Sequence, residues 1–226
     1  SDTLHSLYVG SYGRNTAINT SDVDILVELP SNLFDHYNNL SGNGQSRLLQ
    51  AVRNAILNVY PRSDVRADGQ VIKISFSDGM RFEIVPTFKS IYGGYKYPNT
   101  NCGGKWESTN PKAEQEAMAE KNRSSNGLLY DTCRHIRYIR DNYFSSYHLS
   151  GIVIDSFVYE AIGNWRWLNS GESSSSPSGT YEQVLLNYYN QHGICYGVSI
   201  NAPGSNDTVS TASSYECLGK VLRYMI

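Results

Sequence analysis

Two aspartates, Asp22 and Asp24, stand two residues apart at the start of an aliphatic run. Side chains alternate in an extended strand, so both carboxylates are expected on one face. Val23, Ile25 and Val27 then lie on the other face, where we expect them to be buried. Two like charges side by side are costly unless a cation neutralises them, and carboxylates together with phosphate oxygens are usual ligands of Mg²⁺. The pair therefore predicts a metal-binding site.

Two further features fit chemistry on phosphates. Gly10 allows close backbone approach, and the hydroxyl and amide of Ser11 at a helix N-terminus can hold a polyphosphate. A third acid, Glu83, interrupts the apolar run 80–88. An unpaired buried charge is costly, so Glu83 either has a partner or faces water on an edge strand, and its spacing leaves both readings open.

Hydrophobic spacing and turn residues predict the elements that position these groups. In the first half we expect a strand or helix end over 4–9, a strand from Asp22, a loop-like connection over 31–45, an amphipathic helix over 46–60, a hairpin of strands 71–76 and 80–88, and a long irregular segment over 90–111. Asp78-Gly79 between the two β-rich runs is a strong hairpin signal. The amphipathic helix is expected to cover the sheet.

The second half is expected to be helical. Predicted helices run from Asn110-Pro111 to Arg123, from Gly127 to about Phe144, from Ile152 to about Leu168, over 181–191 and over 213–225, with a flexible loop at 171–179 and an irregular stretch through 201–208. This order predicts an α+β protein with a mixed-sheet core over residues 1–110 and a helical lobe over 111–226. A cleft between the two is the expected active site.

Composition excludes several classes of protein. The 226 residues carry a formal net charge of −2, which gives no strong signal for nucleic-acid binding. No apolar run approaches the roughly 20 residues of a membrane helix, so we expect a soluble, cytoplasmic protein. The cysteines form no C-x-x-C pair and are expected to be reduced, with a disulfide as the minor alternative. The abrupt beginning at a structured element predicts a further segment upstream.

The motifs together resemble a known family. Gly10-Ser11, Asp22-x-Asp24 and the later Phe82-Glu83-Ile84-Val85-Pro86 resemble the polymerase-β-like nucleotidyltransferases. A closer similarity is to the bacterial relatives of cyclic GMP-AMP synthase, the cyclic-oligonucleotide synthases (CD-NTases) of anti-phage signalling (CBASS). This similarity rests on three sequence motifs: GSYGRNTAI from Gly10, GGKW from Gly103 followed by TNP from Thr109, and LSG from Leu149. It extends from about Leu7 to about Trp165.

The resemblance implies catalysis by two Mg²⁺ ions, with Mn²⁺ as a substitute, about 3.5–4 Å apart. Asp22 and Asp24 would hold both ions, and Glu83 would complete the site of the ion that activates the ribose hydroxyl. Members of the family more often have Asp at this third position. The longer Glu83 side chain is therefore a departure that shifts the expected position of that ion.

The resemblance also implies nucleotide ligands. Gly10 and Ser11 would hold the donor phosphates, and Arg134 or Arg137 the triphosphate. Ser150 would supply a hydroxyl ligand, and Thr109 and Asn110 would contact the acceptor base. Without it, helix arginines are more often solvated or paired with an acid, and Ser150 is equally explained as a helix cap.

The predicted reaction joins NTPs (ATP, GTP or a pyrimidine NTP) into a cyclic di- or trinucleotide and releases pyrophosphate. The partners implied are a separately encoded effector activated by the product and an activating protein. Two alternatives remain: a nucleotidyltransferase that modifies a protein, tRNA or small molecule, and an inactive nucleotide-binding sensor.

Overall fold

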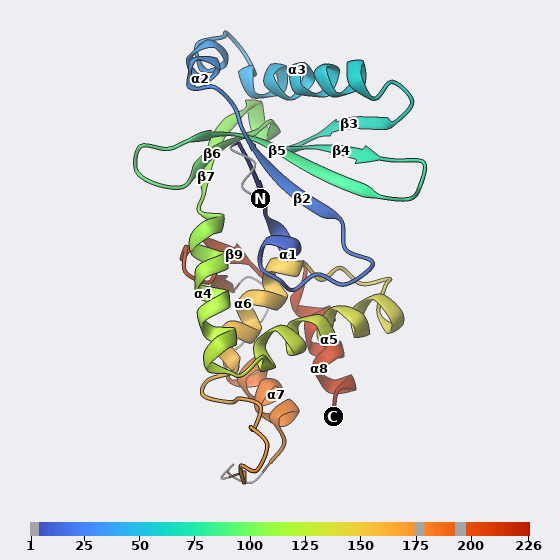
Figure 1. The fold of residues 1–226 in the computed structure, drawn as a ribbon, viewed down its shortest axis with the longest axis vertical. Coiled ribbons are helices and arrows are strands. Elements are labelled where there is room, and N and C mark those ends of the chain that lie inside the picture. Colours follow the sequence, from blue (N-terminus) through green and yellow to red (C-terminus); the bar gives the residue numbers. More distant parts are fainter. Residues whose placement is uncertain (1–4, 175–178, 193–197) are drawn as a thin grey trace. The chain divides into compact units, whose positions relative to one another are not determined.

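The computed structural model describes residues 5–174, 179–192 and 198–226. The chain forms two compact units (Figure 1). The sheet unit comprises Ser1–Gly13 and Thr20–Lys112, and the helical unit comprises Arg14–Asn19 and Ala113–Ile226. The short segment 14–19 was not expected to belong to the helical unit.

The sheet unit is built on a mixed sheet. Its described strands are β1 (Ser6–Tyr8), β2 (Val23–Glu28), β3 (Asp64–Asp68), β4 (Val71–Ser75), β5 (Arg81–Lys89), β6 (Tyr95–Asn99) and β7 (Lys105–Thr109). The order is β1-β2-β5-β4-β3, and β6 pairs with both β5 and β7. Strands β2 and β5 are parallel, whereas the other pairs are antiparallel. The parallel pair at the centre is what brings the predicted acids together.

Two helices pack on one face of this sheet (Figure 1): α2 (Ser31–Asn38) and α3 (Gly44–Val59). Asn43 is the N-cap of α3, because its side chain accepts a hydrogen bond from the Ser46 amide, and the helix ends before Pro61. Its Leu49 packs with Ile72 and Ile74 of β4 in one apolar cluster. This confirms the prediction that the amphipathic helix covers the sheet.

Helix α2 and strands β3, β6 and β7 of this unit were not predicted. Residues 31–45 contain α2, whose Phe34 packs against Trp106 at a ring distance of 4.9 Å. Strand β3 follows α3, and the supposedly irregular segment 90–111 contains the β6–β7 hairpin. This hairpin lacks aliphatic alternation. A polar pair supports it instead, because the hydroxyl of Tyr97 donates to the carboxylate of Glu107, its register partner, at 2.9 Å.

The helical unit contains α4 (Pro111–Ser124), α5 (Leu128–Tyr143), α6 (Gly151–Ala161), α7 (Tyr181–Gln191), α8 (Tyr215–Tyr224) and the short hairpin β8 (Ser199–Asn201) and β9 (Thr208–Ser210). Its core is a single apolar cluster that includes Ile136 of α5, Ile154 of α6, Leu185 of α7 and Leu218 of α8. These helices form because each places an apolar stripe on this shared core.

The helical predictions hold except at two places. Helix α6 ends at Ala161 and not near Leu168, because the chain turns at Gly163, which has a φ of +54°. The stretch 201–208, expected to be irregular, connects β8 and β9 and includes the end of one and the start of the other. Part of the predicted loop at 171–179 lies outside the described residues.

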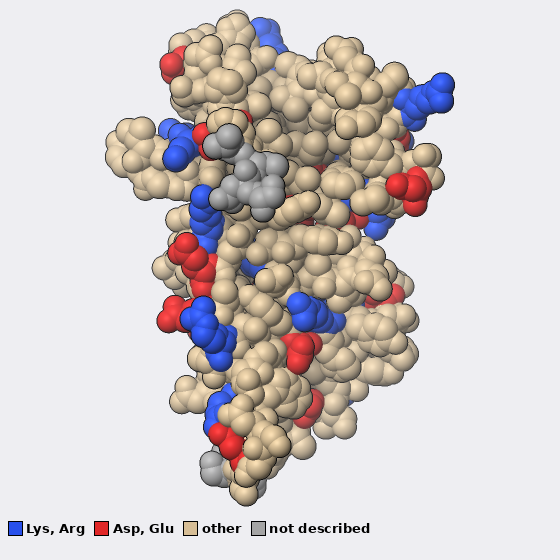
Figure 2. Space-filling model, viewed as in Figure 1, with Lys and Arg blue, Asp and Glu red and all other residues tan. Residues whose placement is uncertain are grey.

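The described cysteines are reduced, as expected, and the surface carries charges of both signs. Cys102, Cys133 and Cys217 are free thiols, whereas Cys195 lies outside the described residues. Acidic and basic side chains are interspersed on the face drawn in Figure 2. In the described parts of the chain, no helix is both long and apolar enough to cross a membrane.

Candidate active site

The parallel pairing of β2 and β5 gathers the predicted acids. Asp24 is the register partner of Glu83 on the neighbouring strand, so both side chains stand on the same face of the sheet. Asp22 directly precedes β2, and continued alternation would put its side chain on that face. The acids lie opposite α3, because Phe82 and Ile84, the neighbours of Glu83, pack into the cluster below that helix. Asp24 and Glu83, from two adjacent strands, thus stand side by side on one face, and Asp22 directly precedes β2.

This arrangement settles two expectations. Strand β5 is paired on both sides, by β2 and β4, so the reading of Glu83 as an edge-strand residue is wrong. The aliphatic face of β2 was expected to be fully buried, but Val23, Ile25 and Val27 are only half-buried. The buried residue of this strand is Leu26, which is 2% exposed and shares the face of the acids.

The turn at Gly10 is fitted to Asp24. The amide of Val9 donates to the Asp24 carbonyl at 2.9 Å, and the one-turn helix α1 (Gly10–Gly13) begins at the next residue. Gly10 has a φ of +58°, and a Cβ added there would lie 1.8 Å from Asp24 Oδ2. Only glycine fits such a position, because any side chain would occupy the place of the carboxylate. Ser11 follows directly and is half-buried.

Cationic side chains flank the outer acids. Arg81 Nε lies 2.7 Å from Asp22 Oδ1, and Lys73 Nζ lies 3.7 Å from Glu83 Oε1. The Asp22 Oδ1 atom is shielded from solvent and makes no aligned hydrogen bond. Among the residues described, no three His, Cys, Asp or Glu side chains converge as a ready metal site. The chemistry of these donors nevertheless fits Mg²⁺, because the three side chains offer carboxylate oxygens.

The predicted base-contacting residues lie at the end of the β6–β7 hairpin. Thr109 is the last residue of β7, and Asn110 precedes α4; both are half-buried. Gly94, with a φ of +66°, packs against them: a Cβ there would lie 2.4 Å from the Thr109 carbonyl. A close backbone approach therefore fixes this end of the hairpin.

In the helical unit, Arg137 is buried. It is 1% exposed, and its two terminal nitrogens donate to the Asp155 carboxylate at 2.7 and 2.9 Å. A further bond from Arg137 reaches the Gly151 carbonyl at 3.0 Å. This geometry speaks against the phosphate contact expected of Arg137, because the guanidinium is already engaged by a buried carboxylate and a carbonyl.

Asp155 is the centre of a buried ionic cluster. Besides Arg137 it accepts hydrogen bonds from Arg14 Nε at 2.8 Å and from Thr16 Oγ1 at 3.0 Å. Burial alone would raise the pKa of Asp155, but the charges and hydrogen bonds of the two arginines outweigh it and lower that pKa. Arg14 also donates to Glu114 at 2.8 Å, yet burial keeps the pKa of Glu114 raised. This cluster anchors segment 14–19 in the helical unit.

Arg134 and Ser150 remain accessible. Arg134 donates to the Asn15 carbonyl at 2.8 Å, and its side chain is 43% exposed. Ser150 occupies the N-cap position of α6, but its hydroxyl makes no capping hydrogen bond. Its backbone amide donates to Ser214 Oγ at 3.0 Å. Ser150 is thus the N-cap residue that the alternative predicted, but its side chain does not cap the helix.

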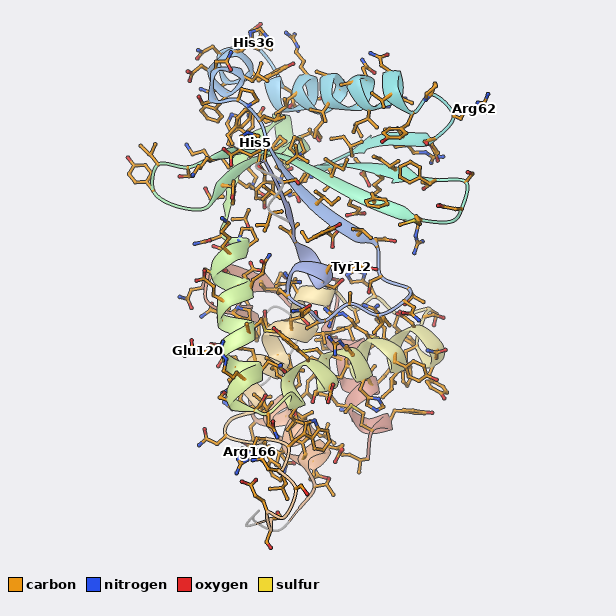
Figure 3. The ribbon with its side chains drawn as sticks, in the orientation of Figure 1. His5, Tyr12, His36, Arg62, Glu120 and Arg166 are labelled. Carbon is orange, nitrogen blue, oxygen red and sulfur yellow. The ribbon has the colours of Figure 1, made fainter. Side chains whose placement is uncertain are left out.

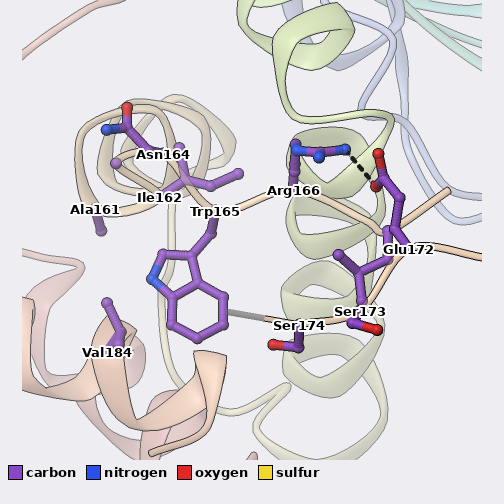
Figure 4. Close-up of a pocket in the computed structure, with 11 residues that line it drawn as sticks. Ala161, Ile162, Asn164, Trp165, Arg166, Glu172, Ser173, Ser174 and Val184 are labelled. Carbon is purple, nitrogen blue, oxygen red and sulfur yellow. Dashed lines mark ion pairs between the residues drawn. The ribbon is translucent and has the colours of Figure 1, made fainter. Parts of the chain in front are cut away.

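A separate pocket of about 600 Å³ lies in the helical unit, around Trp165 and the end of α6 (Figure 4). An ion pair of 2.9 Å between Arg166 and Glu172 belongs to its wall. None of the predicted site residues lines this pocket. The five histidines, of which Figure 3 labels His5 and His36, are exposed.

Sequence reasoning missed Lys73 and Asp155. Lys73 alternates with the buried Ile72 and Ile74, so this spacing already put it on the polar face of its strand. Asp155 interrupts the apolar run at the start of α6, as Glu83 interrupts β5. An acid within an apolar run was the available signal for Asp155 as well as for Glu83, and the sequence analysis used it only for Glu83.

The mixed sheet and the helices that follow it form the α+β fold that the sequence predicted. Residues 1–122 match the family described as the Second Messenger Oligonucleotide or Dinucleotide Synthetase domain. The chain belongs to this family. The predicted fold class and family are thereby confirmed.

Curated relatives agree with this assignment. The chain is 25% identical over 195 residues to a probable cyclic nucleotide synthase of Bacillus cereus (strain VD146), covering 77% of this chain and 58% of the relative. It is 28% identical over 158 residues to the cyclic AMP-AMP-AMP synthase of Acinetobacter sp. (strain ATCC 27244 / 9458), covering 69% and 45%. The chain thus spans about half the length of these relatives.

A solved structure supports the fold. The cyclic dinucleotide synthase CdnE of Elizabethkingia meningoseptica, solved with GTP and Apcpp, superposes with a TM-score of 0.65 at 17% identity. The superposition covers 97% of this chain and 82% of that one.

Proposed function

We propose that this chain carries the synthase activity of a cytoplasmic enzyme that joins NTPs into a cyclic di- or trinucleotide and releases pyrophosphate. The observation that carries the proposal is the register of β2 with β5, which puts Glu83 beside Asp24 on one face. Membership of the synthetase family and two curated relatives named as cyclic nucleotide synthases support it.

In this proposal Asp22, Asp24 and Glu83 are the catalytic acids and hold two divalent ions, Mg²⁺ or Mn²⁺. Bound metal would supply activation of a ribose hydroxyl and neutralisation of the leaving pyrophosphate. Asp24 is held in place by the turn at Gly10, so it is the best-positioned of the three. Glu83 reaches one methylene farther than an aspartate would.

The nucleotide contacts are proposed as follows. Gly10 lets the backbone approach closely, and Ser11 offers its hydroxyl to the donor phosphates. Arg134 supplies an exposed positive charge for the triphosphate, and Ser150 a hydroxyl that does not cap its helix. Arg137 is left out, because it pairs with Asp155. Thr109 and Asn110 remain the proposed acceptor-base contacts.

The substrates proposed are ATP, GTP or a pyrimidine NTP. A separate effector that binds the cyclic product, and a protein that activates synthesis, remain predictions from the resemblance.

The test is product analysis. The chain is incubated with labelled NTP mixtures and Mg²⁺ or Mn²⁺, treated with phosphatase, and the remaining products are identified by mass spectrometry. We expect a phosphatase-resistant cyclic product that Asp24→Asn abolishes. Asp64→Asn is the matched control, because Asp64 belongs to the same sheet but pairs with Arg66 at 2.8 Å, away from the acids.

Each rival has its own outcome. If the label is transferred to a protein, tRNA or small molecule and no cyclic product forms, the chain is a nucleotidyltransferase with that molecule as its acceptor. NTP binding by calorimetry without turnover in any mixture, by a folded chain, would favour the inactive sensor. A cyclic product that survives Asp24→Asn would refute the assignment of the acids.

A further inference from the structure

A row of charged side chains crosses the acid face of the sheet. Glu83 has Asp24 as its register partner on β2 and Lys73 as its register partner on β4. The next partner along the row is Arg66 on β3, opposite Lys73. Register partners project from the same face, so two acids are followed directly by two cations.

Lys73 is placed between two carboxylates. Its Nζ lies 2.6 Å from Asp68 Oδ2 and 3.7 Å from Glu83 Oε1. The Asp68 contact is therefore the closer one, and Glu83 receives the weaker contact. The Lys73 side chain is 48% exposed, so its ammonium is able to move from one carboxylate to the other.

Arg81 makes the corresponding contact with Asp22. Its Nε lies 2.7 Å from Asp22 Oδ1, and it stands two residues before Glu83 on the same face of β5. Both outer acids of the trio are thus neutralised by cations of the sheet itself. A divalent ion bound by the same oxygens would meet these positive charges at short range, where repulsion is strongest.

We infer that Lys73 and Arg81 compete with the divalent metal for Glu83 and Asp22, and so set the metal concentration at which the acids are filled. Asp68 weakens this competition, because it holds the ammonium of Lys73 away from Glu83. Lys73 and Arg81 are positioning residues in this scheme, since each acts through an acid. The inference rests on the proposed function, in which the acids bind metal.

The experiment measures Mn²⁺ binding to the full chain by isothermal titration calorimetry, without NTP and at about 0.15 M salt. For Lys73→Met we expect the Kd for Mn²⁺ to fall about twofold to fivefold, the range set by partly exposed ion pairs. Arg81→Met is expected to change the Kd in the same direction.

Asp68→Asn is expected to act in the opposite direction. With its closer partner neutralised, the Lys73 ammonium shifts to Glu83, and the Kd rises about twofold. General loosening of the sheet would change the Kd in the same direction in both variants. Opposite changes in Lys73→Met and Asp68→Asn would therefore argue against it. The matched control is Arg66→Met, which removes a positive charge from the same face. Arg66 pairs with Asp64 and contacts none of the proposed metal ligands in the described ion pairs. Salt at this concentration screens exposed charges beyond about 8 Å, so Arg66→Met is expected to leave the Kd for Mn²⁺ unchanged.

The outcomes separate this inference from the proposed function. If the chain binds no Mn²⁺, or binds it equally well after Asp24→Asn, both are overturned. If Asp24→Asn abolishes binding but Lys73→Met leaves the Kd unchanged or raises it, only the competition is overturned. Thermal unfolding of each variant without metal checks that it remains folded.

Discussion

Asp155 offers the sharpest test of what holds the helical unit together. Asn at this position has nearly the same shape but no charge, so Asp155→Asn leaves the guanidinium groups of Arg14 and Arg137 without their shared counter-ion. Asp155 is fully buried and accepts four hydrogen bonds of 2.7 to 3.0 Å. Breaking a buried ion pair by removing one partner costs about 3–5 kcal/mol. We expect about 3 kcal/mol, because Arg14 keeps Glu114 as a partner.

The assay is urea unfolding of the full chain, combined with amide hydrogen exchange in α5 and α6, since two units need not unfold in one step. Protection of these two helices should fall together in the variant. Asp64→Asn, at an exposed ion pair, is the control and should change the free energy of unfolding by less than about 1 kcal/mol. A loss below about 1 kcal/mol in Asp155→Asn would refute the reasoning that the cluster stabilises this unit.

The pH dependence of the same comparison has a defined sign. The pKa of Asp155 is lowered in the folded chain, so its contribution to stability is fully present above the ordinary aspartate pKa. It is lost as the pH falls through the lowered folded value. The difference between the parent chain and Asp155→Asn should therefore be constant near neutral pH and shrink only in strong acid. The raised pKa of Glu114 makes its contribution to stability change with pH in the opposite direction. Both chains retain Glu114, so this contribution is common to the two chains that are compared.

Two further predictions concern other sites. Gly10→Ala should reduce product formation about a hundredfold, because the new methyl group displaces the Asp24 carboxylate, whereas Gly79→Ala, at a φ of +89° with open space around it, should leave product formation unchanged. Equal loss in both variants would contradict the steric argument. The hydrogen bond from Arg166 is the main cause that lowers the pKa of Glu172 to about 2, so an NMR titration should give a midpoint near that value. Arg166→Met should move this midpoint toward the ordinary glutamate pKa, and an unchanged midpoint would count against the ion pair.

The parts of the fold with strong periodicity were predictable. Helix α3, the β4–β5 hairpin and most of the helical unit follow from apolar spacing and caps, because each places one side on a core. The β6–β7 hairpin was missed because its pairing depends on a tyrosine, a glutamate and close glycine contacts, which carry no apolar alternation. Helix α2 was missed for a similar reason, since its contacts with the sheet include the aromatic ring of Phe34 and a hydrogen bond from Trp106 to Asn38.

The candidate site was predictable only in part. Alternation along the run that begins at Asp22 predicted that Asp22 and Asp24 share one face, and an acid inside an apolar strand marked Glu83. Which strands are neighbours is a long-range property, so the row from Asp24 to Lys73 could not be read from local spacing. The burial of Arg137 was hidden for the same reason, because its partner Asp155 lies 18 residues away on another helix.

Segment 14–19 limits how the protein can be divided. The chain crosses between its units after Gly13, after Asn19 and after Lys112. A fragment that begins at Ala113 would contain Asp155 and Glu114 but not the arginine that links them. Removing the segment from the sheet unit would also cut the connection between Gly10 and Asp24. Neither unit is therefore a self-sufficient piece for expression or transfer, and domain exchanges with relatives should move residues 14–19 together with the helical unit.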